Sequence, residues 1–299
     1  MDIRGYLNDR KKIVDAALEE YFPKVEGHHS TPAYPSSLRQ AIRHSLFSGG
    51  KRIRPILAMA AFEAVGGKGN GILPFACALE MIHTYSLIHD DLPAIDNDDY
   101  RRGNPTCHKV FGEAIAILAG DGLLTEAFRL MSSVSLSDPA TLLDVIHEIA
   151  LAAGIFGMVG GQVRDIESEG KEVDFETVEY IHTHKTGALI LASVRTGVKL
   201  GGGTGDLLKA YSRYGERIGL AFQIVDDILN IEGKADLMGK STGSDLQKGK
   251  ATYPSLLGIE ESKRRAKDLM ESAIAALNPF GKEMEPLKEI ARFIVLRKT

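Results

Sequence analysis

Two adjacent aspartates, Asp226 and Asp227, interrupt an otherwise apolar helical stretch, GLAFQIVDDILNI. Residues at i, i+3, i+4 and i+7 share one face of a helix, so Gln223 and Asn230 join these aspartates in a single polar stripe. Large aliphatic residues flank the stripe, and carboxylates are costly to bury among them unless a cation or a hydrogen-bond network compensates. The pattern therefore indicates a buried helix that carries a metal site.

A second acidic cluster lies upstream, in the stretch EMIHTYSLIHDDLPAIDNDDYRR at residues 80–102. Here five carboxylates fall within ten residues and two arginines follow: Asp90, Asp91, Asp96, Asp98, Asp99, Arg101 and Arg102. Carboxylates this close repel one another unless they face water or share cations. Alone, the stretch therefore predicts either a solvated loop or a metal site.

The overall charge limits the classes of ligand. A formal net charge of -4 argues against a nucleic-acid binder that relies on overall basicity, so an anionic ligand would be held by local clusters. The chain opens MDIRGYLNDRKK, which lacks a secretory pattern, and we expect no uninterrupted apolar run long enough to insert into a membrane. Cys77 and Cys107 form neither a disulfide framework nor a metal-type spacing. We expect a soluble, cytoplasmic protein with two reduced thiols.

Helical periodicity dominates the chain, and no segment shows a sustained alternation of apolar and polar residues. After two N-terminal helices, which end before Pro23 and at Ser48, the pattern predicts helices at 55–65, 72–90, 112–133, 139–153, 155–169, 175–197, 205–231, 254–277 and 283–297. No linker rich in Pro, Ser or charge marks a boundary. The sequence therefore predicts an all-α bundle of about ten to twelve helices in one domain, residues 1–299.

Basic side chains recur beside glycines. In GGKRIRP at residues 49–55, glycines allow a tight turn, three cations follow, and Pro55 suits the first turn of a helix. This is either an anion site at a helix start or a basic solvated turn, and its spacing differs from the phosphate-binding GxxxxGK[ST] loop. Lys185, Thr186 and Gly187 interrupt an apolar helix and could loosen it, and a polar loop carries Lys240 and Lys250.

Two carboxylate clusters with several cation sets are typical of an anionic ligand bridged by metal. Mg²⁺ prefers one or two carboxylates, several waters and phosphate oxygens to an all-protein cage, and a diphosphate supplies such oxygens. Two opposite charges ~4 Å apart attract by about 4 kcal/mol at an effective dielectric of about 20, so several contacts offset the desolvation of a diphosphate. Adjacent Arg101 and Arg102 point in different directions and could serve two diphosphates.

These residues resemble the trans-isoprenyl diphosphate synthase family, and most of all its bacterial farnesyl diphosphate synthases. The resemblance covers essentially the whole chain. It rests on six motifs in the family's order: GGKRIRP at 49–55, EMIHTYSLIHDDLPAIDNDDYRRG at 80–103, GMVGGQ at 157–162, HKTGALI at 184–190, FQIVDDILN at 222–230 and GKSTGSDLQKGKATYPSLLG at 239–258.

The resemblance implies an isoprenoid-synthase bundle around a central substrate cavity, a homodimer, and residue roles by motif position. It implies magnesium ligands at Asp90, Asp91, Asp96, Asp226 and Asp227. It implies that the allylic diphosphate binds Arg101, Lys185 and Lys240, and that isopentenyl diphosphate binds Gly50, Lys51, Arg54, His83 and Arg102. By the same resemblance, Lys250 is a further substrate-binding residue. It also implies that Thr186 and Gln223, with carbonyls near Lys185, face an allylic cation that the isopentenyl double bond attacks. One departure is Asn230, where many relatives carry a third aspartate.

Product length is the finer expectation. Tyr85 and Ser86 lie one turn or more before Asp90, and a residue five positions earlier on a helix lies about 7.5 Å along its axis. A bulky ring at Tyr85 could act as a pocket floor, which favours the fifteen-carbon farnesyl product over the twenty-carbon geranylgeranyl product. More remote alternatives are a silent subunit of a heteromeric synthase, a terpene cyclase, and a metal phosphohydrolase suggested by the His89-Asp90 pair with His83 nearby.

Overall fold

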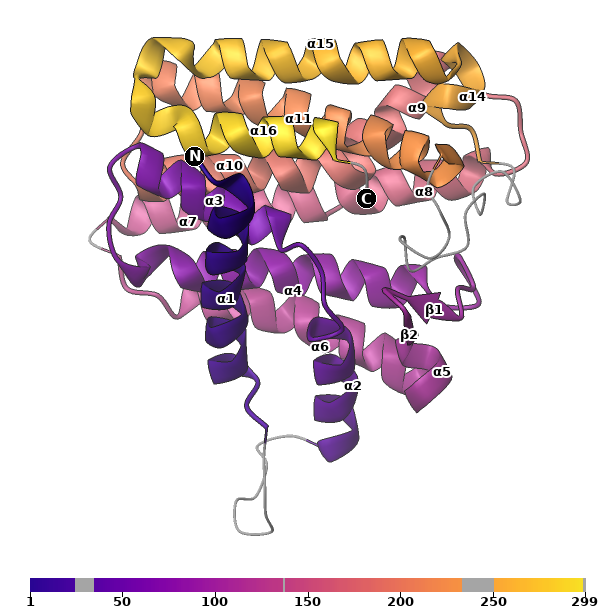
Figure 1. Cartoon of the computed structure of the whole chain (residues 1–299). Coiled ribbons are helices and arrows are strands. Elements are labelled where there is room, and N and C mark those ends of the chain that lie inside the picture. The colour runs from indigo at the N-terminus through magenta and orange to yellow at the C-terminus, as the bar shows by residue number, and fades with distance from the viewer. Residues whose placement is uncertain (25–34, 137, 233–249, 298–299) are drawn as a thin grey trace. The chain divides into compact units, whose positions relative to one another are not determined.

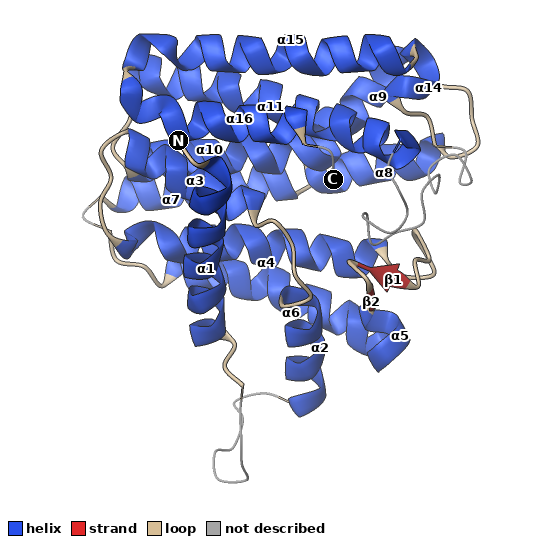
Figure 2. Cartoon of the chain, in the orientation of Figure 1, coloured by secondary structure: helices blue, strands red, loops and turns tan. Residues whose placement is uncertain are grey.

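The computed structural model of the chain describes residues 1–24, 35–136, 138–232 and 250–297. Over these residues the chain is almost entirely helical, and the strands form one two-stranded hairpin (Figures 1 and 2). The all-α prediction is confirmed. Internal contacts group the chain into an N-terminal unit, Arg4–Ile56 and Leu73–Val134, and a C-terminal unit, Met1–Ile3, Leu57–Ile72 and Ser135–Thr299. The single domain and the central cavity stay predictions.

Helix α4 is the core of the N-terminal unit, and its residues from Phe75 to Met81 are at most 1 % exposed. It packs along α6 and also contacts α2. The unit comprises α1 (Ile3–Tyr21), α2 (Ser36–Leu46), α4 (Leu73–Asp90), β1 (Tyr100–Arg101), β2 (Asn104–Pro105), α5 (Cys107–Phe111) and α6 (Glu113–Ser132). Residues on every side of α4 are buried, which explains why its sequence shows little amphipathic periodicity.

The hairpin follows the first acidic cluster and was not predicted. Tyr100 pairs with Pro105 and Arg101 with Asn104 in antiparallel register. Between the strands, Arg102 has a φ of 55° and Gly103 a φ of 78°. Positive φ at both central residues matches the twist that a two-residue hairpin needs. Two residues per strand are too few for alternation to show in the sequence.

Helix α11 is the axis of the C-terminal unit and packs against α10 and α15. The unit's core includes Leu220, Ile224 and Ile228 from one face of this helix, together with Tyr253 and Ala266. Its elements are α3 (Ile53–Ala64), whose first turn up to Ile56 belongs to the N-terminal unit, η1 (Asn70–Ile72), α7 (Pro139–Ala153), α8 (Met158–Ser168), α9 (Phe175–Ile181), η2 (His182–Gly187), α10 (Ala188–Leu200), α11 (Gly205–Glu232), α14 (Tyr253–Leu257), α15 (Ile259–Leu277), η3 (Asn278–Phe280), η4 (Lys282–Met284) and α16 (Glu285–Leu296).

Two predicted helices are divided in the structure. The predicted helix 175–197 contains a π-helical turn, η2, between α9 and α10. The loosening expected from Lys185, Thr186 and Gly187 is thereby confirmed. The predicted helix 254–277 is broken at Gly258, whose φ of 80° lies outside the helical region.

Two helical segments, Asn70–Asp90 and Pro139–Ser168, are long and apolar enough to cross a membrane by length and composition alone. Charged side chains interrupt both segments, among them Glu80 in the first and Asp144 and Glu148 in the second, so the expectation that no uninterrupted apolar run is long enough to cross a membrane stays a prediction. The first segment is 67 % buried and is a core helix, but the second is only 28 % buried. The second segment consists of two helices, α7 and α8, as the sequence predicted.

Candidate active site

The first acidic cluster forms a compact turn at the end of α4. The backbone N–H of Asp96 donates to the carbonyl of Asp90 at 2.8 Å, which folds the turn back on the helix. Asp91 is 3 % exposed and accepts from Nε of Arg101 at 2.9 Å. Arg101 also reaches Asp98 at 3.2 Å. Three predicted metal ligands therefore lie in one turn, and Arg101, predicted to bind diphosphate, holds one of them.

Basic side chains gather around His83 on the same unit. Burial, then the charges of the surrounding guanidiniums, holds the pKa of His83 well below its ordinary value; these are Arg54, Arg102, Arg101 and Arg52. A histidine in such a positive field is neutral, and an anion placed there would be strongly favoured. The structure thus brings together Arg54, His83 and Arg102, as the anion-site interpretation requires.

The glycine turn before α3 completes this basic cluster. Gly50 has a φ of 118°, and a Cβ there would lie 2.5 Å from the guanidinium of Arg102. Arg102 in turn donates to the carbonyl of Gly49. Lys51, next along the chain, is exposed. Gly50 therefore lets the backbone approach Arg102 closely, which accounts for the glycine at this position.

Arg52 is a supporting residue that the sequence interpretation missed. It is 3 % exposed and bonds Glu80 at 2.6 Å, Asp15 at 2.8 Å and the carbonyl of Leu46 at 2.6 Å. It thereby ties the glycine turn to α1, α2 and α4. The motif GGKRIRP contains three cationic residues, and the sequence interpretation gave a binding role only to Lys51 and Arg54. The third, Arg52, could have been recognised as a structural residue because it had no such role.

Tyr85 lies on the buried side of α4, 7 % exposed. Burial, with a smaller effect of Asp90, raises the pKa of its hydroxyl to about 12. Its ring meets the His89 ring edge-on at a centroid distance of 5.7 Å. His89 bonds the carbonyl of Ile117 at 3.0 Å. Ser86, the other candidate chain-length residue, is partly buried and donates to the carbonyl of His83 at 2.9 Å.

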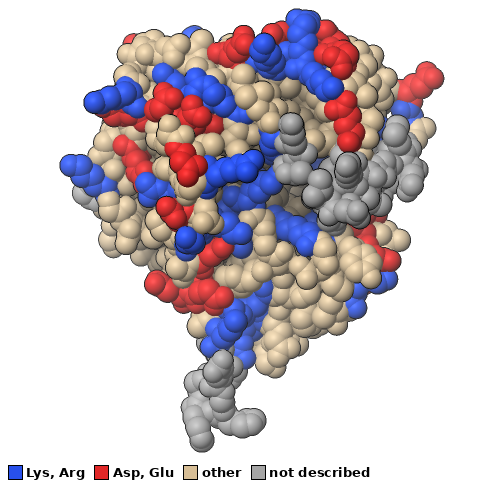
Figure 3. Space-filling model, in the orientation of Figure 1, with Lys and Arg blue, Asp and Glu red and all other residues tan. Residues whose placement is uncertain are grey.

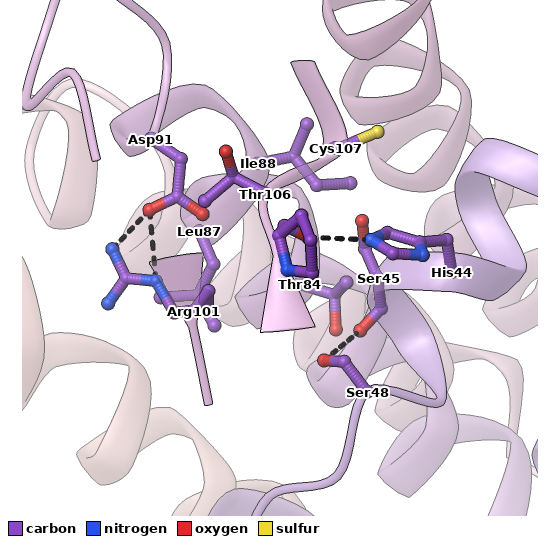
Figure 4. Close-up of a pocket in the computed structure, with 11 residues that line it drawn as sticks. His44, Ser45, Ser48, Thr84, Leu87, Ile88, Asp91, Arg101, Thr106 and Cys107 are labelled. Atoms are coloured by element: carbon purple, nitrogen blue, oxygen red, sulfur yellow. Dashed lines mark hydrogen bonds and ion pairs between the residues drawn. The ribbon is translucent and has the colours of Figure 1, made fainter. Parts of the chain in front are cut away.

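A small cavity of about 20 Å³ lies beside Asp91 and Arg101 (Figure 4). Figure 4 shows Asp91 and Arg101 facing one another on one side, with His44 and Ser45 on the other. Thr84 lines it and is 2 % exposed, and its hydroxyl has no hydrogen-bond partner among the described residues. The volume suits a single water molecule, which would satisfy this hydroxyl.

In the C-terminal unit, Asp227 contacts several groups around the second acidic motif through its carboxylate. It is 3 % exposed and accepts from Nε2 of Gln223 at 3.1 Å and from the backbone N–H of Tyr253 at 3.1 Å. Nε2 of His182 lies 3.3 Å from it. The oxygen of the Gln223 amide accepts from the hydroxyl of Thr186 at 2.8 Å. The predicted pair Thr186 and Gln223 is thus joined, and Gln223 links it to Asp227.

Asp226 differs from Asp227 in exposure and in partner. Its side chain is 42 % exposed and pairs with Arg297 near the chain's end. The Arg297 guanidinium lies 4.3 Å from the centroid of the Phe222 ring. A cation therefore already accompanies this carboxylate, a contact that the sequence interpretation did not foresee. Asn230 is partly buried on the same helix.

A partly buried aspartate in α8 pairs with two lysines that were predicted to bind substrate. Oδ2 of Asp165 lies 2.7 Å from Nζ of Lys185 and 3.3 Å from Nζ of Lys250. Burial opposes ionisation, but the charges of the two lysines keep the pKa of Asp165 below its ordinary value. A Cβ on Gly161 would lie 2.2 Å from the backbone nitrogen of Lys185, so glycine lets α8 approach η2.

Asp165 was missed because the quoted motif GMVGGQ stops at Gln162, one helical turn earlier. Both polar atoms of the Gln162 amide are buried without a partner among the described residues. The signal that could have found Asp165 is its position three residues after Gln162, on the same helix face. Lys240, predicted to bind diphosphate, lies outside the described residues.

No preformed metal cage is present among the described residues, where no three His, Cys, Asp or Glu side chains converge. That arrangement suits Mg²⁺, which takes few protein carboxylates and completes its shell with water and phosphate oxygens. Figure 3 shows acidic and basic side chains interspersed over the face that it draws. Among the described residues, cationic side chains lie together around His83 and around Asp165.

Comparisons with known proteins agree with this geometry. The sequence profile of the Polyprenyl synthetase family matches residues 35–291. A farnesyl diphosphate synthase of Geobacillus stearothermophilus is 47% identical over 275 residues, 91% of this chain and 90% of that protein. A geranylgeranyl diphosphate synthase of Cyanophora paradoxa is 48% identical over 294 residues, 98% of this chain and 95% of that protein.

A solved structure of an FPP/GFPP synthase from Zymomonas mobilis superposes with a TM-score of 0.86 at 36% identity, covering 98% of this chain and 99% of that one. The match therefore extends over the fold as well as the motifs. The profile match and the near full-length identity together establish the relationship: the chain belongs to the polyprenyl synthetase family and is a prenyltransferase.

Proposed function

We propose that this prenyltransferase makes (2E,6E)-farnesyl diphosphate by condensing isopentenyl diphosphate with dimethylallyl and then geranyl diphosphate. The observation that carries the product length is the buried ring of Tyr85, five residues before Asp90 on the helix that leads into the acidic turn. The alternative is geranylgeranyl diphosphate, the product in the name of the Cyanophora paradoxa relative.

Magnesium ions fit the acidic residues of each unit. We propose that Asp90, Asp91 and Asp96 hold them in the N-terminal unit, and Asp226 and Asp227 in the C-terminal unit. When bound, the ions supply Lewis-acid neutralisation of the departing diphosphate. Of the pair, the side chain of Asp226 is the more exposed, although Arg297 already accompanies it, whereas Asp227 is buried and bonded to Gln223, His182 and Tyr253.

Each of the two diphosphate substrates would bind its own set of cationic residues. We propose that Lys185, Lys240 and Lys250 of the C-terminal unit bind the allylic diphosphate, that Arg101 of the N-terminal unit binds diphosphate, and that the cluster of Gly50, Lys51, Arg54, His83 and Arg102 holds isopentenyl diphosphate. In support, Asp165 holds Lys185 and Lys250 side by side, and the arginines surround His83. Preorganised cations stabilise the charge that develops on a leaving group without reorganising during the reaction.

The chemistry then needs no side-chain nucleophile. The allylic C–O bond breaks, the isopentenyl double bond forms the new C–C bond with the cation, and a proton leaves, to the released diphosphate in this proposal. Gln223 is fixed by Thr186 and oriented against Asp227, so its amide dipole keeps one direction. The π-helical turn η2 leaves the regular hydrogen-bond ladder and so redirects backbone carbonyls near Lys185. Both features would stabilise an allylic cation by oriented dipoles.

The proposal is tested by incubating the purified protein with Mg²⁺, labelled isopentenyl diphosphate and either dimethylallyl or geranyl diphosphate. The dephosphorylated alcohols are then identified by chromatography. Farnesol as the main product supports the proposal, and geranylgeraniol as the main product replaces it with the alternative. No condensation with either starter would instead support a silent subunit.

The remaining rivals have weaker support. A phosphohydrolase would need further metal ligands near His89, but His89 bonds the carbonyl of Ile117, and no cluster of three ligands occurs among the described residues. A silent subunit would be expected to lack one acidic cluster, and this chain carries both. A terpene cyclase leaves the basic cluster around His83 without a role.

We further propose a cytoplasmic homodimer. Large apolar side chains remain exposed along α7 and α8 and into the turn between them: Leu143, Leu151, Ile155, Phe156, Val159, Val163 and Ile166. Val159, Val163 and Ile166 recur at i, i+4 and i+7, which places them on one face of α8. An apolar face this extensive is typical of a protein interface. Cys77 and Cys107 are free, buried thiols, which suits a reducing compartment.

A further inference from the structure

A second cavity of about 330 Å³ lies in the C-terminal unit, between α9, α11, α14 and α15. Among these helices, α11 contacts α14 and α15, and α14 contacts α9 and α15 (Figure 1). The cavity's floor is apolar, formed by Leu220, Ile224, Leu269 and Tyr253. Its size falls within the range of small-molecule sites, which are typically apolar with a few placed polar groups.

The charged side chains of its wall differ in how fully they are paired. Arg265 pairs with Glu261 at 3.2 Å and lies over the Phe175 ring at 4.8 Å. Asp268 pairs with Arg264 at 2.9 Å. Both of these wall charges therefore have partners that do not line the cavity.

Arg217 and Glu179 are the exceptions. Within the described part of the chain, Arg217 donates only to the carbonyl of Arg213, at 3.4 Å, and no carboxylate lies within ion-pairing distance. The carboxylate of Glu179 likewise has no cationic partner there, although both residues line the same cavity. A ligand with an anionic group for Arg217 and a hydrogen-bond donor for Glu179 would satisfy both.

The cavity is connected to the second acidic motif through Tyr253. The Tyr253 ring forms part of the cavity floor, while its backbone N–H donates to Asp227 at 3.1 Å. The same ring stacks on His182 at 5.2 Å, and His182 lies 3.3 Å from Asp227. A molecule in the cavity would therefore contact the Tyr253 ring, and through that ring it could affect two of the three groups that fix this carboxylate.

We propose that this cavity is an effector site for a small amphipathic organic acid that also carries a hydrogen-bond donor, and that its occupancy changes magnesium binding at the Asp226–Asp227 motif. The apolar body lies on Leu220, Ile224 and Leu269, and the acid group binds Arg217. The part concerning magnesium rests on the proposed function. The binding part does not, because it needs neither substrate nor turnover.

Binding is tested with 8-anilinonaphthalene-1-sulfonate, a fluorescent apolar anion with one N–H donor. We expect saturable binding that Arg217→Gln weakens about tenfold, the effect of one charge-assisted hydrogen bond. Ser272→Trp, which fills the cavity from α15, abolishes the saturable phase. Arg213→Gln, one turn earlier on α11 and outside the cavity, leaves the affinity unchanged. Octanoate displaces the probe, and octanol at the same concentration does so poorly.

Equal affinities in the wild type, Arg217→Gln and Ser272→Trp would overturn the site, since the probe would then bind elsewhere, such as the exposed face of α7 and α8. Thermal melting of each variant shows whether it is folded, and Leu269→Phe is a milder filling variant should Ser272→Trp fail to fold.

Coupling is tested by repeating the titration with Mg²⁺ and inorganic diphosphate. Linkage is reciprocal, so a ligand that alters magnesium binding must have its own affinity altered by the same factor. A shift of about threefold or more in the probe's affinity supports the coupling, and no shift overturns it. If prenyl transfer is absent while the probe still binds saturably, the proposed function fails and the site stands.

Discussion

At the scale of single residues, Tyr85 decides the proposed product. Its ring is buried on α4 and packs edge-on against His89. We predict that Tyr85→Ala shifts the main product from fifteen carbons to twenty or more, because removing the ring opens space beyond the acidic turn. Product alcohols from the variant and the wild type, made with geranyl diphosphate, provide the measurement.

Tyr85→Phe is the matched control for that variant. It keeps the ring and removes only the hydroxyl, so its product should stay at fifteen carbons. Tyr85→Ala should also lower the free energy of unfolding by about 3 kcal/mol, as large-to-small changes in a core do. An unchanged chain length in a folded Tyr85→Ala protein would show that the floor lies elsewhere.

His83 leads to a prediction about pH. Burial and the nearby arginines hold its pKa well below the ordinary value, so the folded protein keeps it neutral while the unfolded chain protonates it near pH 6.5. Stability is therefore unaffected by His83 above that pH and falls as pH drops below it, because the unfolded state binds the proton. By pH 5.5 the loss is about 1 kcal/mol.

Urea unfolding at pH 7.5 and at pH 5.5 measures this effect. We expect the wild type to lose about 1 kcal/mol more between the two conditions than His83→Gln, which has no proton to bind. The comparison cancels every other titrating group that the two proteins share. Equal losses in both proteins would mean that His83 is protonated as readily in the folded state.

At the scale of elements, the position of η2 depends on glycines. A Cβ on Gly219 would lie 2.9 Å from the Cα of Gly187, so α11 and the π-helical turn touch through backbone. We predict that Gly219→Ala separates them, costs about 1–3 kcal/mol through overpacking, and reduces prenyl transfer by moving Thr186 away from Gln223. Thermal melting and initial rates measure the two effects.

Gly122→Ala in α6 is the control for this substitution. A Cβ there meets its nearest neighbour at 3.7 Å, an ordinary contact, so the helix gains up to about 1 kcal/mol of propensity. Both substitutions replace glycine by alanine, but Gly219→Ala should lower the stability of the protein and Gly122→Ala should raise it. A Gly219→Ala protein as stable and as active as Gly122→Ala would show that η2 does not need this close approach.

The elements were the most predictable part of the structure. Apolar spacing located α6, α7 and α11 to within one residue at each end, because it reports which face each helix buries. The hairpin and the break at Gly258 were not predicted, because each depends on one or two positive φ angles rather than on the spacing of apolar residues. Lys185, Thr186 and Gly187 did signal an irregular turn, although not its π-helical form.

The site was less predictable than the fold because its contacts join distant positions. Asp165 and Lys250 are 85 residues apart, and Asp226 and Arg297 are 71 apart. Spacing along one helix groups Gln223 with Asp227, but it carries no information about a partner on another element. The resemblance to the family's motifs identified Lys185 and Lys250, but it did not identify Asp165, the carboxylate that pairs with both.

At the scale of the whole molecule, the apolar residues exposed on α7 and α8 need an explanation. Phe156 is 70 % exposed and Ile155 is 71 % exposed, far beyond what a monomer needs to leave in water. The same segment passes a length and composition test for a membrane span. A second copy of the chain and a lipid surface are therefore the two candidates, and the proposed homodimer favours the first.

We predict that Phe156→Glu weakens dimerisation by about 2 kcal/mol, or about thirtyfold in the dissociation constant, because a charge replaces a large apolar contact. Sedimentation velocity over a range of concentrations measures the constant. Ile13→Glu on α1, another exposed apolar position, should leave it unchanged. A wild type that is monomeric but co-sediments with lipid vesicles would assign the face to membrane, since the same substitution would then abolish vesicle binding instead.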